Sequence, residues 1–200
     1  MRVAAILLAA GGAERFGGPS KLLAELGGFP LIVHAARAIA GSATCHVAVV
    51  TGRDAGAIET ALSPFAFQFV HNTAWADGMG GSIAAGVLSL PAGVDAALIV
   101  PGDLPFLTPA LLNSLAETFD AATEPRPIVF PQLPDGTQLN PVLWPKRYFS
   151  ELSLLSGPSG GKQLLRSLAE QSVGIIVNDP RLVADIDTKA DLEAARRNLG

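Results

Sequence analysis

The stretch VAAILLAAGGAERFGGPSKLL, residues 3–23, joins an apolar run of strand length to a loop rich in glycine. The run from Val3 to Ala9 carries no polar side chain, which is typical of a strand buried on both faces. The glycines that follow permit backbone conformations in which successive N–H groups converge on one anion. Arg15 adds a planar guanidinium and Lys21 a mobile ammonium. The stretch therefore predicts a strand followed by an anion site suited to a polyphosphate.

The spacing of this loop differs from that of two common phosphate-binding loops. Gly18 and Pro19 stand where a Walker loop requires lysine and then serine or threonine, and the glycines do not match the dinucleotide-binding fingerprint. A glycine-rich turn with two solvated charges is the plain alternative, and glycine content alone favours it. The order of strand, glycines, arginine, glycine and lysine favours the anion site.

The composition limits the class of protein. The 200 residues include 14 Lys and Arg against 18 Asp and Glu, a net charge of −4, which excludes a basic nucleic-acid coat. Hydrophobic residues make up 49% and charged residues 16%, which excludes disorder. The length of 200 residues predicts a single domain over residues 1–200. No apolar run approaches the roughly 20 residues that span a membrane. The lone Cys45 gives no sign of an oxidising compartment, so a cytoplasmic location is expected.

Apolar runs of strand length alternate with segments in which apolar residues recur every three or four positions. We expect strands at 3–9, 46–51, 67–71, 96–101, 128–131 and 173–177, and helices at 30–40, 56–62, 81–89, 109–121, 161–171 and 189–198. This alternation predicts a three-layer α/β/α, Rossmann-like fold with a mostly parallel sheet, whose ligands bind beyond the carboxyl ends of the strands. Residues 124–145 are expected to form a small β elaboration at one end of the site, with a turn at Asp135 and Gly136.

The first loop resembles the nucleotidyltransferase signature of LAAG, three residues, R-F-G, a short spacer and K-L-L. Within that superfamily it is most similar to the molybdenum cofactor cytidylyltransferases. Members that use CTP tend to read LAAG, whereas guanylyltransferase relatives read LAGG followed by arginine. The resemblance implies a nucleotidyltransferase fold with catalytic roles for Arg15 and Lys21. It also implies that the nucleotide is bound by Leu8, Ala9, Ala10, Gly11, Gly12 and Lys21.

A second segment, NTAWADGMGGS at residues 72–82, opens a predicted helix and matches the family string N-x-x-W-x-x-G-M-x-x-S. The resemblance implies that Asn72, Gly78, Met79 and Ser82 hold the nucleoside. Without the resemblance, a simple helix cap with Trp75 in the core accounts for the segment equally well.

Two acidic motifs follow later in the chain. Asp103 ends a predicted strand beside the first loop, where a carboxylate suits Mg²⁺, although a lone aspartate at such a place is usually a turn former or a helix cap. The string DIDTKADL at 185–192 resembles the family's D-[IV]-D-T-P-E-D-L, with departures at positions 189 and 190. The resemblance implies that Asp103, Asp185 and Asp187 face the metal, with Asp187 favoured over Asp185. Asp191 is expected only to support the first turn of the last helix.

Two further segments match the family less completely. Asn140, in QLNPVL, corresponds to the polar residue of G-[NH]-P-V-L, which implies a substrate contact, and a turn amide is the equal alternative. LSGPSGGK at 155–162 corresponds to L-x-G-D-x-G-[AG]-[RK], but Pro158 replaces the aspartate, so no acidic role is assigned there. The three histidines and Cys45 lack metal-ligand spacing, and a zinc site is not expected.

The resemblance implies a Mg²⁺-dependent enzyme, with Mn²⁺ as an alternative metal, that transfers CMP from CTP to the terminal phosphate of molybdopterin and releases pyrophosphate. The implied partners are CTP, the molybdopterin cofactor and a molybdenum hydroxylase as recipient, with neither nucleic acid nor membrane. The alternatives are a GTP-dependent guanylyltransferase or sugar-phosphate nucleotidyltransferase on the same scaffold, and a noncatalytic carrier of the cofactor. The presence of Arg15, Lys21, Asp103 and Asp187 together favours an enzyme.

Overall fold

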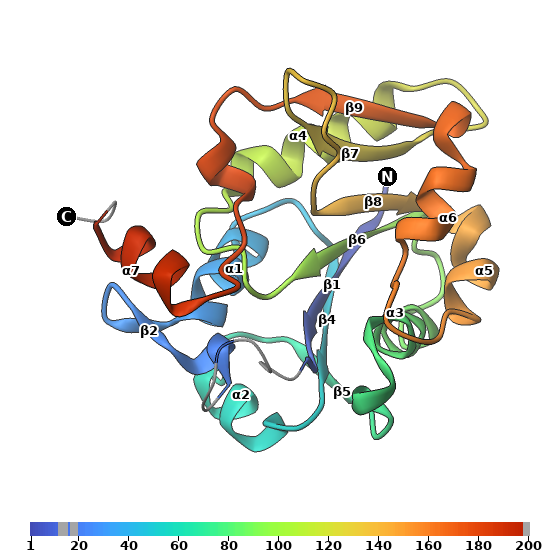
Figure 1. The fold of residues 1–200 in the computed structure, drawn as a ribbon. Helices are drawn as coiled ribbons and strands as arrows, with labels where there is room; N and C mark the ends of the chain where they lie inside the picture. Colours follow the sequence, from blue (N-terminus) through green and yellow to red (C-terminus); the bar gives the residue numbers. More distant parts are fainter. Residues whose placement is uncertain (12–15, 17–19, 198–200) are drawn as a thin grey trace.

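The computed structural model describes residues 1–11, 16 and 20–197, and its main element is a seven-stranded sheet of order β5-β4-β1-β6-β8-β7-β9 (Figure 1). The strands are β1 (Val3–Ala9), β4 (His46–Thr51), β5 (Gln68–His71), β6 (Ala96–Pro101), β7 (Ile128–Gln132), β8 (Val142–Pro145) and β9 (Ser172–Ile176). A separate hairpin is formed by β2 (Glu25–Leu26) and β3 (Phe29–Pro30).

The helices alternate with these strands. They are α1 (Leu31–Ala40), α2 (Ala55–Ala61), α3 (Met79–Leu88), α4 (Pro109–Ala121), α5 (Phe149–Ser153), α6 (Lys162–Ser167) and α7 (Lys189–Arg197). Short 3₁₀ turns occur at Lys21–Leu23, Trp75–Asp77, Lys146–Tyr148, Ala169–Gln171 and Pro180–Val183. In the described part of the chain, no helix has the length and apolar character needed to cross a membrane.

The sheet is mostly parallel, as predicted. β8 runs antiparallel to both of its neighbours, β6 and β7, whereas the other adjacent strand pairs are parallel. Ile99 of β6 faces Val142 and Ala96 faces Pro145, so β8 begins beside the carboxyl end of β6. The chain segment before β8 therefore reaches the same edge as the loops that follow β1 and β6.

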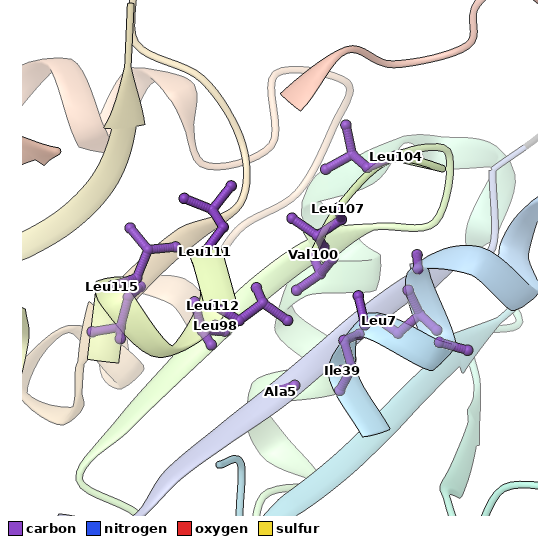
Figure 2. Close-up of a cluster of buried hydrophobic side chains, with 14 of the residues drawn as sticks. Ala5, Leu7, Ile39, Leu98, Val100, Leu104, Leu107, Leu111, Leu112 and Leu115 are labelled. Carbon is purple, nitrogen blue, oxygen red and sulfur yellow. The ribbon is translucent and has the colours of Figure 1, made fainter. Parts of the chain in front are cut away.

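Different helices cover the two faces of the sheet, which produces three layers (Figure 1). Because side chains alternate along a strand, Leu7 of β1 packs with α1, α2 and α4, whereas Ile6 packs with α3, α5 and α6. Figure 2 shows the first of these clusters, in which Leu98 of β6 lies among leucines of α4 such as Leu112. The predicted α/β/α arrangement is confirmed.

The structure differs from the expected elements in three places. Residues 124–145 supply β7 and β8 to the interior of the main sheet, and the turn between them forms at Gly136, which has φ +91°. The apolar strand β8 is only four residues long, so it resembled part of a local elaboration. The hairpin β2-β3, with Gly27 and Gly28 at positive φ, and the short helix α5 had no predicted counterpart. The predicted helix at 161–171 is α6 followed by a 3₁₀ turn.

Candidate active site

The carboxyl ends of β1 and β6 lie side by side and carry the first loop and Asp103. The N–H of Gly102 donates a hydrogen bond of 3.0 Å to the carbonyl of Leu8, and a Cβ at position 102 would lie 2.9 Å from that oxygen. Leu8–Ala10 are buried, while Gly11 is exposed with open space where a Cβ would be. The predicted nucleotide loop therefore starts at the expected edge of the sheet, next to Asp103.

Lys21, predicted to be catalytic, places its ammonium between Asp103 and Asp187, which are predicted to bind metal. Lys21 Nζ lies 2.7 Å from Asp103 Oδ2 and 2.9 Å from Asp187 Oδ1, although Lys21 and Asp187 are 166 positions apart in the chain. Arg15 and Gly12, which were also predicted to belong to the site, lie outside the described residues. Among the described residues, the structure thus joins the first loop, the end of β6 and the segment before α7.

Backbone contacts fix these three segments. Lys21 begins a 3₁₀ turn whose next residue, Leu22, is buried in the core beneath it. The N–H of Ile186 donates a hydrogen bond of 3.1 Å to the carbonyl of Asp103, and the Ile186 side chain packs with Leu192 of α7. The segment 185–187 is therefore held beside the end of β6 by its backbone and by an apolar anchor.

Among the described residues, this group holds more negative than positive charge. Burial by itself lowers the pKa of Lys21, but the carboxylates of Asp103 and Asp187 outweigh burial, and the pKa is raised. The pKa of Asp185 is also raised, first by loss of solvent and then by the charges of Asp103 and Asp187. Lys21 consequently remains an ammonium at neutral pH, and an added cation would relieve the repulsion among the carboxylates.

The oxygen atoms of this group fit a hard divalent cation. Asp103 Oδ1 is buried without a hydrogen-bond partner in the described residues, whereas buried polar atoms normally have one. Mg²⁺ is commonly bound by one or two carboxylates together with phosphate oxygens and waters, and Asp103 and Asp187 provide two carboxylates. Over residues 1–11, 16 and 20–197, no group of three or more His, Cys, Asp or Glu side chains converges as a metal site.

Asp191 caps the N-terminus of α7. Its Oδ2 accepts hydrogen bonds from the backbone N–H of Asp187 at 3.1 Å and of Thr188 at 2.7 Å, and from the Thr188 hydroxyl at 2.8 Å. The N–H of Asp191 donates in return to Thr188 Oγ1 at 3.2 Å, which completes a capping box. The supporting role predicted for Asp191 is confirmed, and the cap also fixes the backbone of Asp187.

Asn72 and Ser82 are both buried and bind each other. Asn72 Nδ2 donates to Ser82 Oγ at 3.0 Å, and Asn72 Oδ1 accepts from the N–H of Ala74 at 3.0 Å. These bonds hold the start of α3 against the loop that follows β5. Asn72 and Ser82, both predicted to bind the nucleoside, are thus buried side chains that stabilise that loop through hydrogen bonds.

The segments 72–82 and 155–162, which matched separate family motifs, touch through their backbones. The N–H of Gly80 donates to the carbonyl of Gly157 at 2.9 Å. A Cβ at Gly78, which has φ +119°, would lie 2.5 Å from the carbonyl carbon of Gly157, and one at Gly80 would lie 2.6 Å from that of Ser156. Met79 between them is half exposed. Only glycine at 78 and 80 allows this approach.

Asn140 and Gly52 also lie at the edge of the sheet where β1 and β6 end. Asn140 precedes β8 and is exposed, and within the described residues its side chain makes no hydrogen bond. A Cβ at Gly52, a position with no predicted role, would lie 2.6 Å from the carbonyl oxygen of Ala10 and 2.7 Å from Trp75 Cβ. Its signal in the sequence was a glycine directly after a predicted strand.

The sequence matches a known family over most of its length. Residues 5–173 match the model of the MobA-like NTP transferase domain. Bifunctional protein GlmU of Agrobacterium fabrum is 32% identical over 124 residues, which cover 60% of this chain and 27% of GlmU. The 2-C-methyl-D-erythritol 4-phosphate cytidylyltransferase of Streptomyces avermitilis is 31% identical over 139 residues, which cover 66% of this chain and 54% of the relative. The chain therefore spans about a quarter and about half of these two relatives.

Solved structures agree with the observed fold. Rv0371c from Mycobacterium tuberculosis H37Rv has a TM-score of 0.85 at 20% identity, with 98% of each chain covered, and its complex with manganese has a TM-score of 0.83 at 19% identity, with 98% of this chain and 99% of that one covered. A nucleotidyl transferase from Methanothermobacter, Mth528, has a TM-score of 0.83 at 25% identity and covers 98% of this chain and 97% of its own. Since the family model matches well over half of the sequence, this chain belongs to the MobA-like NTP transferase domain family.

Proposed function

We propose that the protein transfers CMP from CTP to the terminal phosphate of the molybdopterin cofactor and releases pyrophosphate. The observation that carries the proposal is the contact of Lys21 with Asp103 and Asp187 beside the loop after β1. The preference for cytidine rests on the LAAG motif at Leu8–Gly11 and agrees with the cytidylyltransferase among the relatives. The preference for molybdopterin rests on the resemblance of the motifs along the chain.

The reaction must bring two anions together, and the residues of the first loop address that problem. Lys21 and the backbone amides around Gly11 would bind phosphate oxygens of CTP and stabilise the departing pyrophosphate. Arg15, by the family resemblance, would add a second cation. Because the attacking phosphate oxygen already carries negative charge, the chain needs neither a general base nor a covalent intermediate.

Asp103 and Asp187 would hold a divalent cation, with Asp185 beside them. When bound, Mg²⁺ or Mn²⁺ would offset the charge that develops on the phosphate oxygens and would align the α-phosphate. The buried, unpartnered Oδ1 of Asp103 and the raised pKa of Asp185 support this role. The manganese complex of Rv0371c, a protein of the same fold, agrees with it.

A panel of nucleotides tests the proposal. Purified protein is given molybdopterin with CTP, GTP, ATP or UTP, and pyrophosphate release is measured. We expect CTP to support turnover at least tenfold better than the others. Turnover with GTP alone would identify a guanylyltransferase, and turnover with a sugar phosphate in place of molybdopterin would refute the proposed acceptor.

Asp103→Ala separates an enzyme from a cofactor carrier. We expect the variant to be folded, as a cooperative unfolding transition would show, but to lose at least about 100-fold in turnover. A loss of this size is the scale of removing one transition-state contact. Asp120→Ala, at an exposed position of α4, is the matched control and should keep full turnover. A carrier would instead deliver molybdopterin to a molybdenum hydroxylase equally well with Asp103→Ala and with the wild type.

A further inference from the structure

The ammonium of Lys21 fills the gap between the two carboxylates proposed to bind metal. Its nitrogen lies 2.7 Å from Asp103 Oδ2 and 2.9 Å from Asp187 Oδ1, so it touches one oxygen of each. A Mg²⁺ ion bound to those same two oxygens would sit about 2.0–2.1 Å from each of them. The ion and the ammonium would compete for the same space, and their positive charges would repel each other.

The backbone positions of the three residues are fixed, so the lysine side chain is the part that can yield. The turn at Lys21–Leu23 is anchored by buried Leu22, and the segment around Asp187 is held by the Ile186 hydrogen bond to Asp103 and by the α7 cap. The Lys21 ammonium, in contrast, is carried at the end of a flexible chain of four methylene groups. A metal can therefore bridge Asp103 and Asp187 through the oxygens that Lys21 contacts only if the ammonium leaves, although Asp103 Oδ1 stays open to it.

The ammonium needs another anion before it can leave. The Lys21 side chain is 18% exposed, so water can replace its two carboxylate partners only in part. Removing an ammonium from its partners in such a place is costly unless a new negative group pairs with it. The phosphates of a nucleotide bound at the adjoining loop after β1 are such a group.

We propose that Lys21 makes metal binding conditional on nucleotide: its ammonium excludes divalent cations from Asp103 and Asp187 until triphosphate oxygens draw it away. This inference rests on the proposed function in taking a nucleoside triphosphate as substrate and Asp103 and Asp187 as the metal ligands. Nucleotide and metal then bind with positive coupling, and by thermodynamic linkage each raises the affinity for the other by the same factor. Lys21 is thus a positioning residue for the metal as well as a phosphate ligand.

Direct metal binding tests the inference. Mn²⁺ retained by the protein is measured by rapid ultrafiltration, with and without CTP and with no acceptor present. We expect the wild type to retain Mn²⁺ at least tenfold more tightly with CTP than without it. Lys21→Met should retain Mn²⁺ without CTP at least fivefold more tightly than the wild type does, and CTP should add little further.

Three variants control this experiment. Lys146→Met removes a positive charge at an exposed position far from Asp103 in the sheet and should bind Mn²⁺ as the wild type does. Lys21→Arg keeps the charge and should still exclude Mn²⁺ in the absence of CTP, which keeps the inference testable if Lys21→Met is unstable. Asp103→Asn should abolish Mn²⁺ retention with or without CTP, which locates the ion.

The inference is overturned if Lys21→Met binds Mn²⁺ no more tightly than the wild type, or if CTP leaves Mn²⁺ affinity of the wild type unchanged. Either result is compatible with pyrophosphate release by the wild type, in which case only the conditional loading fails. Absence of pyrophosphate release with every nucleotide would instead refute the proposed function.

Discussion

Gly80→Ala tests whether α3 and the loop at 156–160 must meet backbone to backbone. Gly80 lies in the first turn of α3, and its N–H donates to the carbonyl of Gly157 at 2.9 Å. A Cβ at this position would lie 2.6 Å from the carbonyl carbon and oxygen of Ser156 and 2.7 Å from its nitrogen. Backbone atoms cannot rotate aside as a side chain can, so the loop itself would have to move.

The expected cost follows from this contact. Overpacking of a close contact costs about 1–3 kcal/mol, and the better helix propensity of alanine returns up to about 1 kcal/mol. Because the contacted atoms belong to the backbone, the upper part of the overpacking range, about 2–3 kcal/mol, applies. The net loss is then about 1–2 kcal/mol, which corresponds to a fall of about 2–8 °C in Tm for a chain of this size. Thermal unfolding followed by circular dichroism measures this change in Tm.

Gly56→Ala is the matched control. Gly56 lies in α2, and a Cβ there would meet nothing within 4 Å. The same substitution should therefore stabilise the protein by about 0.4–1 kcal/mol, through the lower entropy of the unfolded chain. The reasoning is refuted if Gly80→Ala melts at or above the wild-type temperature while Gly56→Ala behaves as expected.

Three further predictions concern the stability of the site. Asp191→Ala removes the α7 cap and should lower the free energy of unfolding in urea by about 0.5–2 kcal/mol. Hydrogen bonds from Thr188 lower the pKa of Asp191, so this stability is present above the unfolded pKa and is lost as pH falls through the folded pKa. An equal cost at pH 3 and pH 7 would contradict the prediction. Asp185→Asn removes a carboxyl whose pKa is raised, chiefly by burial. The raised pKa favours the folded state at low pH, and this stability is lost as pH rises through the folded pKa. Thermal unfolding should therefore show the variant more stable than the wild type by under about 1 kcal/mol at pH 7 and equally stable at pH 3, and a loss at pH 7 would count against the prediction. Asn72→Ala should cost about 1–3 kcal/mol because the Ser82 hydroxyl stays buried without its donor, and in a double-mutant cycle with Ser82→Ala strict additivity would show that the pair is not coupled.

Much of the fold followed from local pattern because most strands of the sheet are buried on both faces. β1 and β6 are uninterrupted apolar runs between polar loops, and their observed limits, Val3–Ala9 and Ala96–Pro101, are those expected. β8 was not placed in the sheet because four residues give no period, and its partners β6 and β7 are chosen by packing of distant segments.

The site divides in the same way. Lys21, Asp103 and Asp187 were identifiable because each follows a recognisable motif, and the parallel sheet brings strand ends to one edge. The contact of Asp103 and Asp187 with the Lys21 ammonium depends on the Ile186 hydrogen bond and the α7 cap, which join segments far apart in sequence. The approach of Gly80 to Gly157 was likewise invisible, because a glycine records only the absence of a side chain and not what occupies its place.

The single reversed strand, β8, has a consequence for how the domain opens. Within the described residues, β7 and β9 join the rest of the sheet only through the backbone pairing of β8, which spans four residues. Pairing of β9 with β7 is extensive, with five residue pairs in register, whereas β7 and β8 share one. The backbone pairing is therefore weakest between β7 and β8. Amide protons of β7 and β9 are expected to exchange with solvent as one cooperative unit before those of β1 and β4.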